Sequence, residues 1–198
     1  MGSTFILHAS DVHCRRGAFR KLSSLEDFDI LAFTGDFECI ESVEELLSLP
    51  VKVLAVTGNV DHASIYRLLV ESGAALDGRT ATVAGLTFAG VGGIDPSTSI
   101  KKLDAANQTI HVLLSHHPPY GILDVTFYGN HAGLEALRDL VLRVKPRLHL
   151  FGHIHESRGS LTQAGVTFVN PGPLREGFYA LIEIKGGEVV RVSLKELN

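Results

Sequence analysis

The sequence of 198 residues lacks several features that would place it in a specialised class of protein. Its two cysteines, Cys14 and Cys39, are too few for a disulfide framework, and we expect both to be free thiols in a reducing compartment. The first eleven residues put no positive charge before their short apolar stretch, unlike a secretory signal peptide. No apolar run approaches the roughly 20 residues that a membrane-spanning helix needs. We therefore expect a cytoplasmic protein without a membrane partner.

Basic residues are also scarce. The 18 lysines and arginines stand against 22 aspartates and glutamates, and the formal net charge of −4 argues against a nucleic-acid-binding surface. A phosphate-bearing ligand would have to be held locally, by metal ions or by a few arginines. The length, the hydrophobic content of 45% and the lack of repeats or linkers are typical of one globular domain, which we expect to span residues 1–198.

The hydrophobic pattern predicts an α/β fold. Apolar runs alternate with amphipathic stretches in the first part of the chain, which predicts βαβ units and a mainly parallel sheet. The apolar runs are residues 4–10, 29–36 and 51–59, and the amphipathic stretches are residues 38–49 and 62–73. Over residues 79–93, short runs with glycine turns predict antiparallel strands, and apolar spacing predicts a helix over residues 131–146. The expected architecture is two packed sheets with helices outside them.

Residues of the metal-ligand type follow five of these strands. They are Asp11, His13, Asp36, Asn59, His116, His153 and His155. Each of these short motifs, taken alone, is common in turns that bind no ligand. In open α/β sheets, however, the carboxyl ends of the strands gather at one edge, where ligands bind. Imidazole and carboxylate donors without matching cysteines suit divalent Mn, Fe, Co, Ni or Zn. Seven donors exceed what one ion needs, so they predict a two-metal centre with a bridging carboxylate.

The ordered motifs Asp-x-His, Gly-Asp, Gly-Asn, His-x-Pro and Gly-His-x-His resemble those of the calcineurin-like metallophosphoesterase family. The likeness extends from Asp11 to the Val-Asn-Pro-Gly-Pro stretch at 169–173. Residues 131–173 further resemble a small prokaryotic branch related to cyclic-nucleotide phosphodiesterases. The resemblance implies a four-layer αββα sandwich of two mixed sheets flanked by helices.

The resemblance also implies a role for each donor. The first metal would be bound by Asp11, His13 and His155. The second would be bound by Asn59, His116 and His153. Asp36 would bridge the two ions. The His-x-Pro motif selects His116 over His117, which leaves His117 to face the substrate, to support the ligands, or simply to pack in its loop.

The implied activity is hydrolysis of a phosphate ester by metal-activated hydroxide, without a covalent intermediate. Many relatives carry Gly-Asn-His-Asp/Glu, whose histidine assists the leaving group, but Val60 stands in that place here. General-acid help contributes about 10²–10⁴-fold, so its loss favours phosphodiesters and activated aryl esters. His62 or His117 are candidates to replace it, although His62 also fits a helix N-terminus.

Other residues have two interpretations each. Asp61 is a candidate to orient Asn59 or a ligand histidine, or to cap a helix. Asn130 and His131 lie where the resemblance implies a substrate loop, and Asn130 alternatively fits a helix cap. The remaining arginines and histidines fall into two groups. Candidate phosphate contacts, or solvated side chains, are Arg15, Arg16 and Arg158. Structural histidines within strands are His8, His111 and His149.

Together these features predict a dinuclear-metal-dependent phosphodiesterase acting on a small phosphodiester, with a 2′,3′- or 3′,5′-cyclic nucleotide as the expected substrate. A phosphomonoesterase shares the same metal chemistry and is the alternative within enzymes. An inactive interaction scaffold is the alternative of another class, and the seven filled donor positions argue against it.

Overall fold

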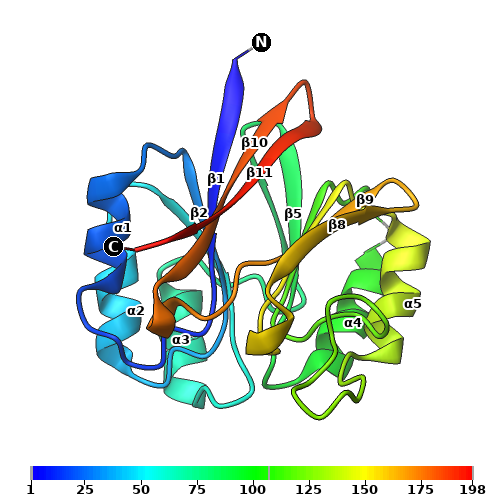
Figure 1. Ribbon diagram of the computed structural model, residues 1–198, viewed down its shortest axis with the longest axis horizontal. Helices are drawn as coiled ribbons and strands as arrows, with labels where there is room; N and C mark the ends of the chain where they lie inside the picture. Colours follow the sequence, from blue (N-terminus) through cyan, green and yellow to red (C-terminus); the bar gives the residue numbers. More distant parts are fainter. Residues whose placement is uncertain (1, 107, 198) are drawn as a thin grey trace.

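Two β-sheets pack face to face between two groups of helices in the computed structural model, which describes residues 2–106 and 108–197 (Figure 1). The first sheet has the strand order β11-β10-β1-β2-β3. Its strands are β1 (Ser3–Ala9), β2 (Ile30–Thr34), β3 (Lys52–Val56), β10 (Phe178–Lys185) and β11 (Glu188–Glu196). This arrangement confirms the predicted sandwich of two mixed sheets flanked by helices.

The second sheet has the order β4-β5-β6-β7-β9-β8. Its strands are β4 (Thr80–Val83), β5 (Leu86–Val91), β6 (Val112–Ser115), β7 (Leu148–Leu150), β8 (Gly159–Gln163) and β9 (Val166–Asn170). The helices are α1 (Ala18–Leu25), α2 (Ile40–Leu47), α3 (Ala63–Glu71), α4 (Pro96–Ala106) and α5 (Glu135–Val144). Two single 3₁₀ turns complete the described elements: η1 (His155–Ser157) and η2 (Leu174–Glu176).

Each sheet has a parallel centre and antiparallel edges. The strands β1, β2 and β3 run parallel, as predicted, and β10 and β11 add an antiparallel hairpin beside β1. The expectation of antiparallel strands over residues 79–93 is confirmed by β4 and β5. The strands β5, β6, β7 and β9 run parallel, and β8 adds an antiparallel edge beside β9. The helices α4 and α5 carry the chain back across the sheet, and such crossovers produce parallel pairs.

Three apolar clusters fill the spaces between the four layers. In β2, Leu31 and Phe33 pack toward α1, α2 and α3, whereas Ile30 and Ala32 pack toward the second sheet. Successive side chains of a strand point to opposite faces, so a strand buried on both faces reads as a continuous apolar run. The third cluster joins the outer face of the second sheet to α4 and α5. No helix in the described part of the chain is long and apolar enough to span a membrane.

The helix predictions were less complete. Helices α1 and α4 were not predicted, because polar and small residues outnumber the apolar ones in both. The helix predicted over residues 131–146 begins only at Glu135, with Leu134 as its N-cap residue, so the interpretation of Asn130 as a helix cap is wrong. The segment before Glu135 is held in a loop because the N–H of Gly133 donates to the buried carboxylate of Asp124.

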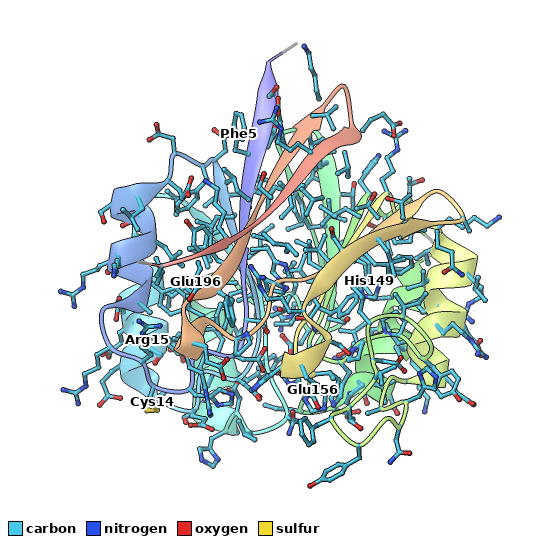
Figure 2. All side chains as sticks on the ribbon, viewed as in Figure 1. Phe5, Cys14, Arg15, His149, Glu156 and Glu196 are labelled. Atoms are coloured by element: carbon cyan, nitrogen blue, oxygen red, sulfur yellow. A yellow bond between two sulfur atoms is a disulfide. The ribbon has the colours of Figure 1, made fainter. Side chains whose placement is uncertain are left out.

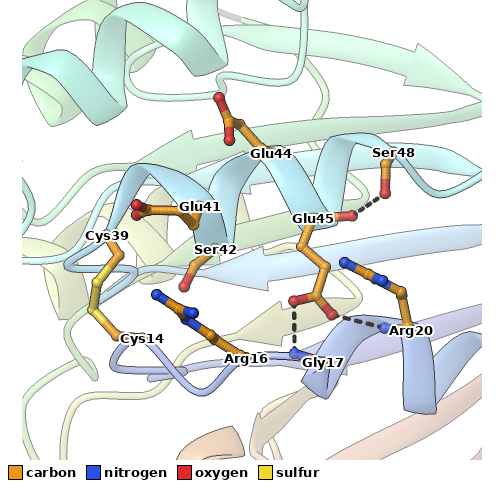
Figure 3. Close-up of a pocket in the computed structure, with 10 residues that line it drawn as sticks. All are labelled: Cys14, Arg16, Gly17, Arg20, Cys39, Glu41, Ser42, Glu44, Glu45 and Ser48. Atoms are coloured by element: carbon orange, nitrogen blue, oxygen red, sulfur yellow. Dashed lines mark hydrogen bonds between the residues drawn. A yellow bond between two sulfur atoms is a disulfide. The ribbon is translucent and has the colours of Figure 1, made fainter.

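The expectation of two free thiols is wrong, because Cys14 and Cys39 form a disulfide (Figure 2, Figure 3). The parallel strands β1 and β2 lie side by side, so the loops that follow them meet, and the two Cα atoms lie 5.4 Å apart. The buried carboxylate of Glu45 on α2 reinforces this junction by accepting hydrogen bonds from the N–H groups of Gly17 and Arg20. Only the folded topology brings these cysteines together, since 25 positions separate them along the chain.

Reduction of this disulfide should destabilise the fold. A crosslink spanning 25 positions restricts the unfolded chain enough to contribute about 3 kcal/mol. We expect a reductant to lower the free energy of unfolding by about that amount in urea titrations, and a Cys14→Ser/Cys39→Ser variant to be insensitive to the reductant. Two reactive thiols in the denatured, unreduced protein would contradict the pairing.

Candidate metal centre

Loops at one edge of the two sheets carry all seven predicted metal ligands. The loops follow β1, β2, β3, β6 and β7. In Figure 1, β1 runs from the N-terminus at the top toward the lower side of the molecule, and β2 and β3 run parallel to it. Parallel strands place their carboxyl ends at a common edge, so residues far apart in the sequence meet there. The structure gathers their side chains into two adjacent groups.

The first group consists of Asp11, His13 and His155, whose potential ligand atoms all lie within 4.8 Å of one another. The Oδ1 atom of Asp11 is 3.2 Å from Nε2 of His155, and Oδ2 of Asp11 accepts a hydrogen bond from the N–H of His153. The Nε2 atom of His13 is buried and has no hydrogen-bond partner among the described residues. A buried nitrogen without a partner is costly, and a cation placed among these atoms would satisfy it.

The second group consists of Asp36, His116 and His153, again with ligand atoms within 4.8 Å of one another. The Oδ1 atom of Asn59 joins this group at 2.8 Å from Nε2 of His116. Asp36 lies between the two groups, with Oδ1 3.4 Å from Nε2 of His116 and Oδ2 3.9 Å from Nε2 of His13. A carboxylate in this position has one oxygen for each group.

The hydrogen bonds of His116 test whether the second group suits a cation. The Nδ1 atom of this fully buried ring lies 2.7 Å from the carbonyl oxygen of Thr34, to which it can only donate. In the neutral ring, Nε2 then carries a lone pair. That lone pair faces the oxygens of Asn59 and Asp36 and the Nδ1 atom of His153. A shared cation would turn this repulsion into attraction, so the donor set fits a metal ion.

Burial and mutual contacts shift the pKa values of these groups in different directions. Burial acts to raise the pKa of Asp11, but His155 and His116 lower it to about 2, so the carboxylate is ionised. The hydrogen bond to Asp11 raises the pKa of His155. Burial raises the pKa of Asp36 although His116 opposes the change. Burial lowers the pKa of His153 to about 4, which keeps its imidazole in the neutral form that binds metals.

The backbone around the centre adopts conformations that side chains normally avoid. Ten non-glycine residues in the described chain have positive φ angles, and six of them lie in these loops: Asp11, His13, Cys14, Asp36, Glu38 and His153. Such residues cluster at functional sites because the surrounding structure holds them there. Gly152 is required for a steric reason, because a Cβ atom at that position would overlap Ser10 and Asp11.

Comparison with known proteins assigns the family. A model of the calcineurin-like phosphoesterase superfamily domain matches residues 5–187. The chain belongs to this superfamily. The membership confirms the resemblance of the five motifs and makes phosphate esters the substrate class of the family, whose members bind divalent metals.

Named relatives of this phosphoesterase-family chain agree with the assignment. It is 38% identical over 73 residues to human Metallophosphoesterase domain-containing protein 1, covering 36% of this chain and 22% of that protein. Among solved structures, TT1561 of Thermus thermophilus has a TM-score of 0.75 at 18% identity, with 100% of each chain covered. A structure described as a novel archaeal phosphodiesterase has a TM-score of 0.64 at 16% identity, covering 97% of this chain and 100% of the other. At these identities the two structures support the fold alone.

The chain aligns with only 16% to 24% of the length of five curated relatives that it matches. Their alignments are short, between 62 and 73 residues. The family model shows that the chain shares a domain family with these proteins. Because the alignments cover so little of them, their activities and partners are not transferred to this chain.

Asp61 connects the two loops that follow β2 and β3 in this phosphoesterase domain. Its Oδ1 atom accepts hydrogen bonds from the N–H groups of Phe37 and Glu38, and its Oδ2 atom accepts from Asp36 and Gly58. The prediction that Asp61 caps a helix is wrong, because His62 is the N-cap residue of α3. Asp61 does not hydrogen-bond Asn59 or a histidine among its described contacts, so it orients the ligand loops through their backbone.

Glu38 is a residue of the site that was not predicted from the sequence. Its Oε1 atom lies 2.8 Å from Nδ1 of His13, on the opposite side of the ring from the unpartnered Nε2. This contact holds the ring in the tautomer whose Nε2 can bind a cation. The signal in the sequence was slight, because Glu38 is only an acidic residue two positions after Asp36.

The remaining candidates lie at or beyond the rim. His117 is half-buried, with its ring centroid 4.5 Å from that of His153, and burial lowers its pKa to about 3. Asn130 and His131 lie on an exposed loop, where Nδ1 of His131 is 2.7 Å from Asp124. Their described contacts are within that loop, so the structure does not join them to the two groups.

The arginines proposed as phosphate contacts are mostly engaged elsewhere. Arg15 donates to the carbonyls of Leu174 and Arg175, and Arg158 donates to those of Pro171 and Lys195. Arg16 is exposed. The strand histidines have partners in the core or at a sheet end: His8 contacts Thr34, His111 accepts from Thr87, and His149 contacts Ser115.

A Glu38→Ala substitution should weaken metal binding to the first group. Loss of a carboxylate that orients a ligand histidine commonly lowers metal affinity about 10–100-fold. Isothermal titration of the metal-free protein with Mn²⁺ would measure this change. Glu44→Ala, which removes an exposed carboxylate of α2, is the matched control. Unchanged affinity in Glu38→Ala would show that His13 needs no such support.

An Asp61→Ala substitution should destabilise the folded state. It removes the acceptor of four backbone N–H groups, and buried donors without a partner cost roughly 1–3 kcal/mol each before relaxation. We expect a loss of about 3 kcal/mol in urea unfolding and a smaller loss in Asp61→Asn, which keeps one oxygen. The exposed Asp27→Ala is the control. Equal stability of Asp61→Ala and the control would exclude this role.

Proposed function

We propose that the protein is a phosphodiesterase that uses two divalent metal ions. The observation that carries the proposal is the arrangement of seven donors as two groups around Asp36. In this assignment Asp11, His13 and His155 hold one ion. Asn59, His116 and His153 hold the other. Asp36 bridges them, and the ions are Mn, Fe, Ni, Co or Zn, in keeping with the nitrogen and oxygen donors.

Two such ions supply Lewis acidity toward phosphate oxygens and an activated water nucleophile. The chain's own residues keep the ions close together and in a fixed orientation. Asp11 holds the Gly152–His155 segment against the first loop through the N–H of His153 and the ring of His155. Asn59 keeps its side-chain oxygen beside His116. Hydrogen bonds within the chain hold these donors in place, which limits the reorganisation needed at the moment of reaction.

The lack of a histidine at position 60 supports a diester over a monoester. The side chain of Val60 is 39% exposed, and its N–H donates to Asp36, so an aliphatic group occupies the place of the leaving-group acid. Without a proton donor there, leaving groups that depart as stable anions are favoured. His117 is the imidazole next to the second group, and we assign it a substrate-facing role.

An interaction scaffold of the same fold would not need this centre. Buried polar atoms that have no partner, or that repel their neighbours, lower the stability of the fold. Here they include Nε2 of His13, and Nε2 of His116 where it faces the oxygen of Asn59. A chain without an activity to maintain has no reason to keep that cost at these positions. A phosphomonoesterase stays the alternative within enzymes.

Metal addition to the metal-free protein should restore hydrolysis of bis-p-nitrophenyl phosphate in preference to p-nitrophenyl phosphate. Asp36→Asn should lower kcat by at least 10²-fold, because one carboxylate serves both groups. Asp139→Asn, whose side chain is 55% exposed on α5, is the control. Faster hydrolysis of the monoester would favour the phosphomonoesterase, and metal binding without turnover of either compound would favour the scaffold.

A further inference from the structure

Two neighbouring aromatic side chains stand in solvent on the loop between β6 and α5. Phe127 and Tyr128 are each 86% exposed, more than any other large hydrophobic side chain in the described chain. Their ring centroids lie 6.0 Å apart with the planes at 88°, so one ring presents its face beside the edge of the other. Exposed apolar side chains that lie next to one another are a common mark of interaction and ligand-binding sites.

Hydrogen bonds hold the loop that carries them. The N–H of Gly129 donates to the carbonyl of Thr126, which makes Phe127 and Tyr128 the two central residues of a tight turn. The buried carboxylate of Asp124 accepts from the N–H groups of Gly121 and Gly133 and contacts Nδ1 of His131. The two rings are therefore exposed because they stand at the centre of a turn that hydrogen bonds fix in place.

The same turn is attached to the segment that bears the metal ligands. The N–H of Phe127 donates to the carboxylate of Glu156, the residue after His155. The hydroxyl of Ser157 donates to the carbonyl of Val125. Glu156 lies at the loop-bearing end of the molecule, between its two halves (Figure 2). The turn that carries the aromatic pair is thus hydrogen-bonded to the two residues that directly follow the ligand His155.

We propose that Phe127 and Tyr128 form an aromatic platform that binds a planar ring on an ester arm of the substrate. The inference rests on the proposed phosphodiesterase function, because the phosphate of the same molecule would lie at the metal groups. A ring stacked on the exposed face of one side chain and against the edge of the other recovers the apolar contact that both lack in the free protein. The platform selects phosphodiesters that carry an aromatic or heterocyclic group.

Diphenyl phosphate and diethyl phosphate test the platform because they carry the same charge and differ in their rings. Their dissociation constants can be measured from ³¹P relaxation in the presence of Mn²⁺-loaded protein, which requires no turnover. We expect the wild-type protein to bind diphenyl phosphate about tenfold more tightly, equivalent to about 1.4 kcal/mol. The Phe127→Ser/Tyr128→Ser variant should lose most of that preference and keep its affinity for diethyl phosphate.

Two further variants separate the platform from a general effect of surface polarity. Val190→Ser removes an apolar side chain that is 53% exposed on β11, and it should keep the wild-type preference. Tyr128→Phe keeps the ring and should also keep it. For bis-p-nitrophenyl phosphate, the double serine variant should raise KM about tenfold with kcat unchanged.

The outcomes distinguish this inference from the proposed function. A ring preference that disappears in the double serine variant supports the platform, even if the protein hydrolyses no diester and the proposed activity fails. Equal binding of the two diesters by the wild-type protein, or a preference that survives in the double serine variant, overturns the platform whether or not hydrolysis occurs.

Discussion

Four backbone N–H groups from two loops converge on the carboxylate of Asp61, and the candidate metal centre depends on that convergence. The loop after β2 carries Asp36 and Glu38, and the loop after β3 carries Asn59. Without Asp61, the loop after β2 would have to hold Asp36 and Glu38 at positive φ without compensation. A single buried acceptor offsets that cost and sets the spacing of the two loops, so both metal groups depend on a residue that belongs to neither.

The sequence was most informative where two residues of the metal-ligand type are separated by one residue. Pairs such as Asp11 with His13, and His153 with His155, follow apolar runs that were correctly interpreted as strands. The prediction that these pairs gather at one edge needed only the parallel order of the central strands. Fold class and the gathering of the donors at one edge were therefore accessible from local patterns combined with one rule of topology, whereas the division of the donors into two groups was implied by the family resemblance.

Features that depend on contacts between loops were not accessible in this way. The disulfide of Cys14 with Cys39 and the contact of Glu38 with His13 both join the loop after β1 to the loop after β2. Asp61 was predicted to orient Asn59 or a ligand histidine, or to cap a helix, whereas its partners are backbone groups, which leave no mark on the sequence. The helices α1 and α4 were missed because their few apolar residues are enough to cover a sheet and too few to form a clear pattern.

The candidate metal centre and the hairpin between β10 and β11 lie at opposite ends of the first sheet. Lys185 pairs with Ser3 at the start of β1, so the hairpin that joins β10 to β11 lies at the far end of the sheet from Asp11. Gly186 and Gly187 form the tip of that hairpin. A tether or a reporter domain introduced there would leave the ligand loops facing outward, which makes this tip the natural point of attachment for immobilising the protein on a solid support.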